Sequence, residues 1–244
     1  MKKTRKFIVA LLLSLWSIFM LFGVTGCIKD SKITIGNITY EYQNNHYVVV
    51  DCKSEAVEAI IVSEINGKSV TKIDDSAFFL CGSLISVTIP DTVTTIADSP
   101  FNACVKLTNI TVAQNNPAYK SIDGNLYNKD GSILIRYAAG KTNLSFKIPD
   151  SVTTIEKHAF NNSHRLRYVT IPDSVTTIRE DAFFACTRLI MLTIPNSVKF
   201  IGFHAFDACD NLTIYCETEN KPDGWDMYWN SSRCPVVWGY TEEN

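Results

Sequence analysis

The amino-acid sequence predicts a repeat solenoid of mixed α/β class that is rich in strands. The octapeptide IPDSVTTI occupies residues 148–155 and recurs unchanged at 171–178, with near copies at 89–96 and 194–201. These copies follow a 23-residue period that is interrupted once, and a fixed period of about 20 to 50 residues is typical of stacked repeats. Apolar residues also keep the same places in every unit. Units this short bury such residues only by stacking on one another.

Each unit of the predicted solenoid starts at a proline or a glycine, and the apolar columns are counted from that residue. The starting residues are Gly67, Pro90, Pro149, Pro172 and Pro195. A valine follows after three places, an isoleucine after six and a leucine after seventeen. The eleventh place holds a phenylalanine in every unit: Phe78, Phe101, Phe160, Phe183 and Phe206. We expect these rings to form one buried row.

Three short elements are expected in order within a unit, as residues 169–186 illustrate. VTI at 169–171 alternates apolar and polar side chains as a strand does. PDS at 172–174 is a turn, because proline presets its backbone angle and aspartate can bond its own backbone. VTTI at 175–178 is a second extended stretch. DAFFAC at 181–186 is expected to close the coil as a single helical turn.

Three segments depart from the period. Residues 27–66 are expected to form a tether and an N-terminal strand cap ahead of a solenoid at 67–215. An insertion at about 113–148 contains an Asp-Gly pair that predicts a hairpin. Residues 216–244 form a Trp-rich C-terminal cap, which is needed because the last repeat otherwise exposes its core. The aromatic residues expected to be buried there are Trp225, Tyr228, Trp229 and Trp238.

The unit LRYVTIPDSVTTIREDAFFAC at 166–186 resembles the bacterial BspA-like class of leucine-rich repeat. The resemblance extends over about 67–216. Where commoner leucine-rich repeats keep a buried asparagine, this chain has a hydroxyl, at Ser69, Thr92, Ser151, Ser174 and Ser197. We expect these hydroxyls to satisfy backbone groups in its place. BspA-like proteins are associated with surface adhesion and host-protein binding, so the resemblance implies a non-enzymatic binding protein.

The N-terminal residues predict export and lipid anchoring. A basic start precedes an apolar run at 7–24, which is the order of a secretory signal peptide over residues 1–26. The run is also long enough for a retained membrane helix. VTGC at 24–27 resembles the lipobox of bacterial lipoproteins. That resemblance implies that Cys27 carries the lipid and holds the mature chain at the outer side of a bacterial membrane, on the cell surface.

Charge and motif content exclude several classes of function. Four of the 23 basic residues lie in the leader, so 19 remain against 25 acidic residues. This balance gives no basic face for nucleic acid. The sequence contains no nucleophile elbow, phosphate loop or zinc-protease motif. We therefore expect neither catalysis nor a cofactor.

The cysteines divide into a column and a pair. One cysteine stands in the same column of four units, at Cys81, Cys104, Cys186 and Cys209. Adjacent rungs about 4.8 Å apart are within reach of a disulfide, but we interpret the column as buried free thiols. Cys216 and Cys234 flank the C-terminal cap, and we expect them to form a disulfide, which export permits. A reducing habitat would leave that pair open.

A second column contains the residue types of a metal or acid–base site. His158, Asp181 and His204 stand nine places after the proline in three consecutive units. Two imidazoles around a carboxylate are able to hold a metal ion, and the distant alternative is a metal-dependent hydrolase. Opposite charges in the neighbouring columns favour an ordinary exposed turn, and ion-pair networks also produce such clusters. No metal site is expected.

The candidate binding face is the outward row of the strands. Alternation places Tyr168 and Met191 on neighbouring strands, away from the core, together with Lys147 and Asn109. Aromatic residues and methionine are favoured at protein interfaces. We expect one continuous surface on a monomer that binds a protein of a host or of a neighbouring cell. An architectural envelope lipoprotein without a specific ligand is the alternative.

Overall fold

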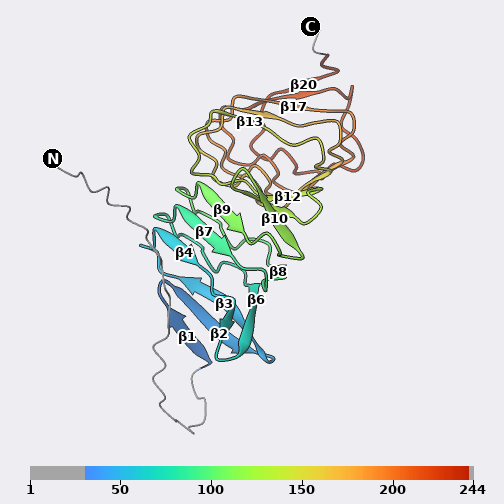
Figure 1. Cartoon of the computed structure of the whole chain (residues 1–244). Helices are drawn as coiled ribbons and strands as arrows, with labels where there is room; N and C mark the ends of the chain where they lie inside the picture. Colours follow the sequence, from blue (N-terminus) through green and yellow to red (C-terminus); the bar gives the residue numbers. More distant parts are fainter. Residues whose placement is uncertain (1–30, 242–244) are drawn as a thin grey trace, which may run out of the picture. The chain divides into compact units, whose positions relative to one another are not determined.

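Strands and turns make up residues 31–241, the part of the chain that the computed structural model describes (Figure 1). This range contains no helix, and therefore none that is long and apolar enough to cross a membrane. The predicted signal peptide and Cys27 lie outside the described residues.

An antiparallel meander begins the described chain. It consists of β1 (Lys32–Ile35), β2 (Ile38–Gln43) and β3 (His46–Cys52). β3 then pairs in parallel with β6 (Lys68–Ile73), which also receives the short antiparallel strand β5 (Glu64–Ile65). The meander is thus joined directly to the parallel strands that follow, and it covers the first of them by main-chain hydrogen bonds.

Two rows of parallel strands build the solenoid, and each of its turns, here called a rung, contributes one strand to each row. The first row consists of β4 (Glu58–Ile60), β7 (Ser86–Ile89) and β9 (Asn109–Val112), then β13 (Ser145–Lys147), β15 (Tyr168–Thr170), β17 (Met191–Ile194), β19 (Thr213–Cys216) and β20 (Val236–Trp238). The second row consists of β6 and β8 (Thr95–Ile96), then β12 (Ile133–Arg136), β14 (Thr154–Ile155), β16 (Thr177–Ile178) and β18 (Phe200–Ile201). Tyr168 pairs with Met191, 23 residues on, as the period requires.

The insertion divides both rows. β10 (Tyr119–Ile122) and β11 (Asn125–Asn128) are antiparallel, and the predicted hairpin turn connects β11 to β12. β12 then pairs in parallel with β14, so the insertion supplies a strand of the second row. In the first row, β4, β7 and β9 form one sheet and β13 to β20 another. The expectation of one continuous outward surface is therefore wrong.

The core consists of stacked columns, as predicted. Phe160 and Phe183 are parallel, with ring centroids 4.7 Å apart, and Phe183 and Phe206 follow at 5.2 Å. Phe78 stacks on Phe101 at 5.1 Å. All five rings are buried, but the insertion splits the row, and a tyrosine of the insertion, Tyr137, stacks on Phe160 in the gap. Two hydrophobic clusters result, one on each side of the insertion.

The hydroxyl column performs the backbone role expected of it. Ser174 and Ser197 donate to the carbonyl oxygens of Val152 and Val175 in the preceding rung, at 2.7 and 2.8 Å. Ser151 does the same toward Gly131 of the insertion. Each hydroxyl thus fastens one rung to the next.

The segment DAFFAC is not the helical turn that the sequence suggested. Asp181 and Ala185 both have positive φ, at 53° and 57°. The same two places have positive φ in most other rungs, so the chain makes two tight turns in succession and cannot continue a helix. Histidine, aspartate and asparagine tolerate this conformation better than most residues, which explains why such residues occur at the first of these places.

The C-terminal cap is a further rung with tryptophan in the core columns. Trp225 forms a bridge to Ile201, and Trp229 packs edge-on against Phe206 at 5.8 Å. Both are buried, as predicted for the cap. Tyr228 and Trp238 are 52% and 36% exposed, so the predicted burial is wrong for these two residues. They lie at the margin of the rung, where no further rung covers them.

Candidate functional site

The outward face of the sheet β13–β20 contains the residues that sequence alternation selected. Parallel register aligns Ser145, Tyr168, Met191 and Thr213 in one row. The next row on the same face begins with Lys147. Tyr168 and Met191 are 45% and 40% exposed, whereas the residues between the rows, such as Val169, are buried. The predicted alternation is confirmed on these strands.

A hollow of about 550 Å³ lies over this face. Tyr168, Met191 and Lys147 line it, and the C-terminal rung adds Tyr240 and Glu217. Two turn residues, Asp150 and Asp173, complete a mostly acidic margin. We call this hollow the strand groove. It combines aromatic and thioether surface with carboxylates, which suits a polypeptide segment that carries apolar and basic side chains.

Contacts within the strand groove leave most of its groups available. Lys147 Nζ lies 3.4 Å from an Asp150 carboxylate oxygen, and both side chains are largely exposed. An exposed pair of this kind contributes little to stability, so it can open toward a ligand at small cost. Glu217 accepts a hydrogen bond from the backbone N–H of Asn196 at 2.9 Å, which positions its carboxylate at the margin.

Asn109 lies apart from the strand groove. It belongs to β9, in the sheet on the other side of the insertion. Its amide Nδ2 donates to Thr111 Oγ1 at 2.8 Å, and its Oδ1 lies close to the backbone at Gly124 of the insertion. The four sequence-selected residues therefore do not form one site: three gather in the strand groove and the fourth packs beside the insertion.

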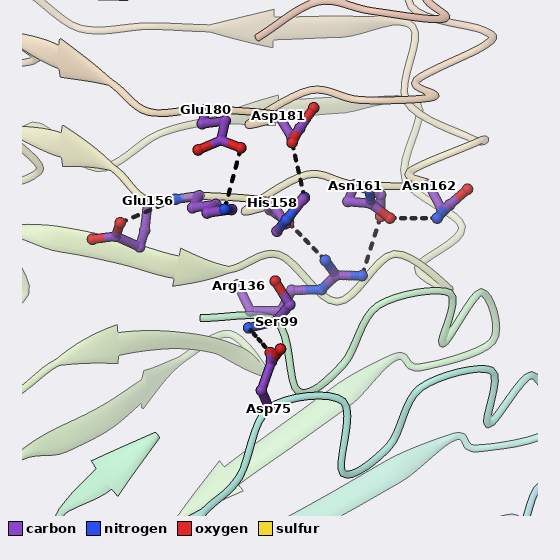
Figure 2. A network of polar contacts seen from close by, with 10 residues as sticks. Asp75, Ser99, Arg136, Glu156, His158, Asn161, Asn162, Glu180 and Asp181 are labelled. Carbon is purple, nitrogen blue, oxygen red and sulfur yellow. Dashed lines mark hydrogen bonds and ion pairs between the residues drawn. The ribbon is translucent and has the colours of Figure 1, made fainter. Parts of the chain in front are cut away.

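The histidine and aspartate column has the spacing of neighbouring rungs but not the geometry of a metal site (Figure 2). His158 Nδ1 and Asp181 Oδ2 are 4.0 Å apart, and no group of three His, Cys, Asp or Glu residues in residues 31–241 is arranged to hold a metal ion. His204 instead stacks on Phe203 at 3.5 Å. All three have positive φ, so the column is explained by the backbone turn.

Burial shifts the two facing groups toward their neutral forms. Desolvation lowers the pKa of His158, and the nearby positive charges of Lys157 and Arg136 lower it further. Desolvation raises the pKa of Asp181, and the carboxylate of Glu180 adds to this. An imidazole held neutral beside a carboxylate does not form the ion pair that general-base chemistry would use.

Arg136 explains how the broken rung is closed (Figure 2). Its guanidinium is buried and donates to the carbonyl oxygens of His158 at 2.7 Å and Asn161 at 3.1 Å. Between ordinary rungs, backbone N–H groups fill this role, as when Asn162 N donates to Phe184 O. The insertion lacks that turn, and the arginine fork supplies the donors instead. Desolvation lowers the pKa of Arg136 to about 10, so it stays charged at neutral pH.

The pKa direction of His158 gives a testable pH dependence. The unfolded chain binds a proton at this histidine more readily than the folded chain does, so stability falls as pH drops below about 6.5, toward the lower folded pKa. Replacement by asparagine, which tolerates positive φ, is expected to reduce this loss. Thermal unfolding at pH 7 and pH 5 should show a larger decrease in Tm for the wild type than for His158→Asn.

A matched control for this experiment lies in the antiparallel meander. His46→Asn is expected to keep the pH dependence of the wild type. Asp181 acts in the opposite direction at lower pH, since its folded pKa is raised, and it is present in all three proteins. An identical decrease in Tm in the wild type and His158→Asn would contradict the assignment.

The cysteine column extends further than the sequence analysis proposed. Cys104, Cys186 and Cys209 donate to the carbonyl oxygens of the phenylalanines of the preceding rung, at 3.0 to 3.2 Å. Cys234 continues the column, with its Sγ 3.5 Å from Cys209 O. Cys216 and Cys234 are both free and buried, so the structure does not contain the expected disulfide. Burial raises their pKa values to about 12 and about 11, which leaves them unreactive thiols.

A family model now connects these rungs with known proteins. The model for the BspA type leucine-rich repeat region matches six copies, over residues 51–133 and 137–221. This is well over half of the chain. The chain belongs to the BspA-type leucine-rich repeat family. The matched copies begin before residue 67 and continue past 215, in agreement with parallel strands such as β4 and β20 beyond those bounds.

Solved structures agree with the family assignment at the level of the fold. A leucine-rich repeat protein from Eubacterium ventriosum is 22% identical with a TM-score of 0.59, and the match covers 84% of this chain and 77% of that one. The pneumococcal vaccine antigen PcpA is 16% identical with a TM-score of 0.51, covering 86% and 85%. A leucine rich cell surface protein from Faecalibacterium prausnitzii is 17% identical with a TM-score of 0.37, covering 86% and 98%. No match was found among curated proteins.

Sequence reasoning missed part of the strand groove. Asp150 and Asp173 both directly follow the proline of their units, so the column count could have placed them at the margin of the outward face. Tyr240 and Glu217 belong to the C-terminal rung, whose register was hidden by its altered core residues. A period extended from Ile214 to Val236, which pair in the structure, would have revealed them.

Proposed function

We propose that this BspA-type repeat protein is a non-enzymatic, surface-displayed binding protein whose strand groove holds a segment of a protein partner. The observation that carries the proposal is the pairing of Tyr168 and Met191, both half-exposed on adjacent strands within a hollow of about 550 Å³. Leucine-rich repeat proteins generally act through protein–protein contacts, and nothing in residues 31–241 has the geometry of a catalytic centre. Adhesion to host or neighbouring cells is the role that this supports.

The proposed site is tested by removing its two anchors. Full-length protein is screened against host matrix proteins and surface proteins of neighbouring bacteria, and the binders are compared with a Tyr168→Ala/Met191→Ala double variant. We expect the variant to bind at least about tenfold more weakly, because central aromatic anchors carry a large share of interface energy, and tenfold corresponds to about 1.4 kcal/mol. Surface plasmon resonance measures the change.

Ile60→Ala provides the matched control. Ile60 is 60% exposed and has the corresponding outward place on β4, in the sheet beyond the insertion. It is expected to bind as the wild type does. Undiminished binding by a correctly folded double variant would refute the placement of the site.

The anchoring at the surface is proposed from the leader sequence. Cells that express the full chain are labelled with an alkyne-tagged fatty acid, and the protein is isolated and probed for the tag. Wild type is expected to carry the label and Cys27→Ala to lose it, since no other cysteine follows a lipobox-like sequence. Two acyl chains suffice for stable anchoring, so Cys27→Ala should also be released into the medium or periplasm. Equal labelling of both proteins would contradict lipid attachment at Cys27.

A further inference from the structure

A second hollow lies in the turns that carry the phenylalanine column, away from the strand groove. It measures about 250 Å³ and is lined by residues from both sides of the insertion. Phe79 and Asn102 come from the N-terminal rungs, and His158 and Asp181 come from the C-terminal rungs. We call it the turn pocket. Its size suits a small group.

The turn pocket exists because one rung is incomplete. In ordinary rungs each turn rests on the next by hydrogen bonds, as between Leu80 N and Asn102 O at 3.2 Å. Between the turns of Asn102 and Asn161 the insertion supplies the guanidinium of Arg136 below, but no turn above it (Figure 2). The side chains that border this gap consequently face an opening instead of a neighbouring rung.

The polar groups that border the turn pocket lack partners. Asn102 Oδ1 and His158 Nδ1 are buried and have no hydrogen bond in the described structure. Among residues 31–241, no side chain or backbone group donates a hydrogen bond to the Asp181 carboxylate, whose only close polar neighbour is His158 Nδ1 at 4.0 Å. Buried polar groups are almost always paired, so this set is suited to an external group that donates hydrogen bonds.

The walls and the local charge define which donor fits. Two phenyl rings, Phe79 and Phe184, line the turn pocket, and aromatic faces attract cations. Lys157 is already engaged by Glu180, at 3.2 Å. Arg136 directs its donors to backbone carbonyls. The neutral state of His158, which burial favours, leaves the Asp181 carboxylate without a counter-ion. An aromatic-walled pocket with an unneutralised carboxylate and an amide oxygen matches a cation with several N–H donors.

We propose that the turn pocket binds an alkylammonium ion, either a free primary amine or the end of a lysine side chain. The ammonium donates to Asp181 and to Asn102 Oδ1, and the alkyl chain lies between the phenyl rings. This site is independent of the strand groove, because the two share no residue.

The test observes the pocket amides directly. Full-length protein in detergent micelles is labelled with ¹⁵N-asparagine, and the side-chain signals of Asn102 and Asn162 are assigned by single substitution. Butylammonium chloride probes the free amine and N-acetyl-lysine amide probes the side chain, with 1-butanol and butyrate as neutral and anionic controls. Saturable shifts of these signals with either amine, and not with the controls, are expected. The amine that binds identifies the source.

Two variants separate recognition from folding. Asp181→Asn keeps a residue that tolerates positive φ and is expected to weaken amine binding at least about tenfold while its Tm stays near that of the wild type. Asp91→Asn, an exposed carboxylate in another turn, is expected to bind as the wild type does. The absence of saturable shifts with both amines, equal shifts with 1-butanol, or unchanged binding in Asp181→Asn would each overturn the proposal. The Tyr168→Ala/Met191→Ala variant should retain amine binding.

Discussion

Replacing Phe183 with alanine is expected to lower the free energy of unfolding by about 3 to 5 kcal/mol, the usual cost of removing a buried phenylalanine. Phe183 is fully buried and stacks on a phenylalanine on each side, at 4.7 and 5.2 Å. The cavity would therefore interrupt the column between two rungs. Because each rung contacts only its neighbours, little elsewhere can close the gap. Urea denaturation followed by circular dichroism measures the loss.

The control for this substitution is the phenylalanine next to the column. Phe79 is 52% exposed, and Phe79→Ala is expected to change the free energy of unfolding by about 1 kcal/mol or less. Equal destabilisation by Phe183→Ala and Phe79→Ala would contradict the stacked-column account of the core.

Replacing Arg136 with methionine is expected to destabilise the fold by about 2 kcal/mol or more. The guanidinium supplies donors to two carbonyl oxygens, those of His158 and Asn161. Leaving a buried acceptor unpaired costs about 1 to 3 kcal/mol. Removing a buried charge returns part of that cost, so the net effect is smaller than the loss of both bonds. Urea denaturation gives the net value.

Arg136→Lys distinguishes the donor role from the charge. An ammonium keeps the charge but lacks the planar fork that reaches two acceptors in fixed directions. We expect the lysine variant to be destabilised as well, by about 1 kcal/mol or more, because one carbonyl loses its partner. Wild-type stability in Arg136→Lys would show that the charge, and not the fork, closes the broken rung.

The repeated parts of the fold were predictable because two periodicities agree. The 23-residue spacing set the register of strands such as β15 and β17, and the alternation within each strand separated Val169 from Tyr168. The turn at 181–186 was not predictable in the same way. Its residues favour a helix locally, and the positive φ of Asp181 and Ala185 follows from the need to return the chain to the next strand within one rung.

Features that depend on a missing partner escaped the sequence reasoning. The role of Arg136 is visible only once the insertion is seen to lack a turn, since an arginine in a strand is otherwise expected at the surface. The division of the outward face has the same origin, because β12 was read as part of a hairpin and not as a strand of a rung. Tyr168 and Met191 were found because they depend on strand alternation alone.

Site-specific photo-crosslinking tests the central claim most directly, namely that the strand groove is the binding site. A photoreactive phenylalanine analogue is placed singly at positions 168 and 191, and at positions 60 and 86 on the sheet beyond the insertion. Full-length protein on living cells is then irradiated in the presence of host cells or neighbouring bacteria, and adducts are identified by mass spectrometry. Adducts with one partner protein at 168 and 191, and none at 60 and 86, are the predicted result. Adducts of equal yield at all four positions, or only at 60 and 86, would contradict the account.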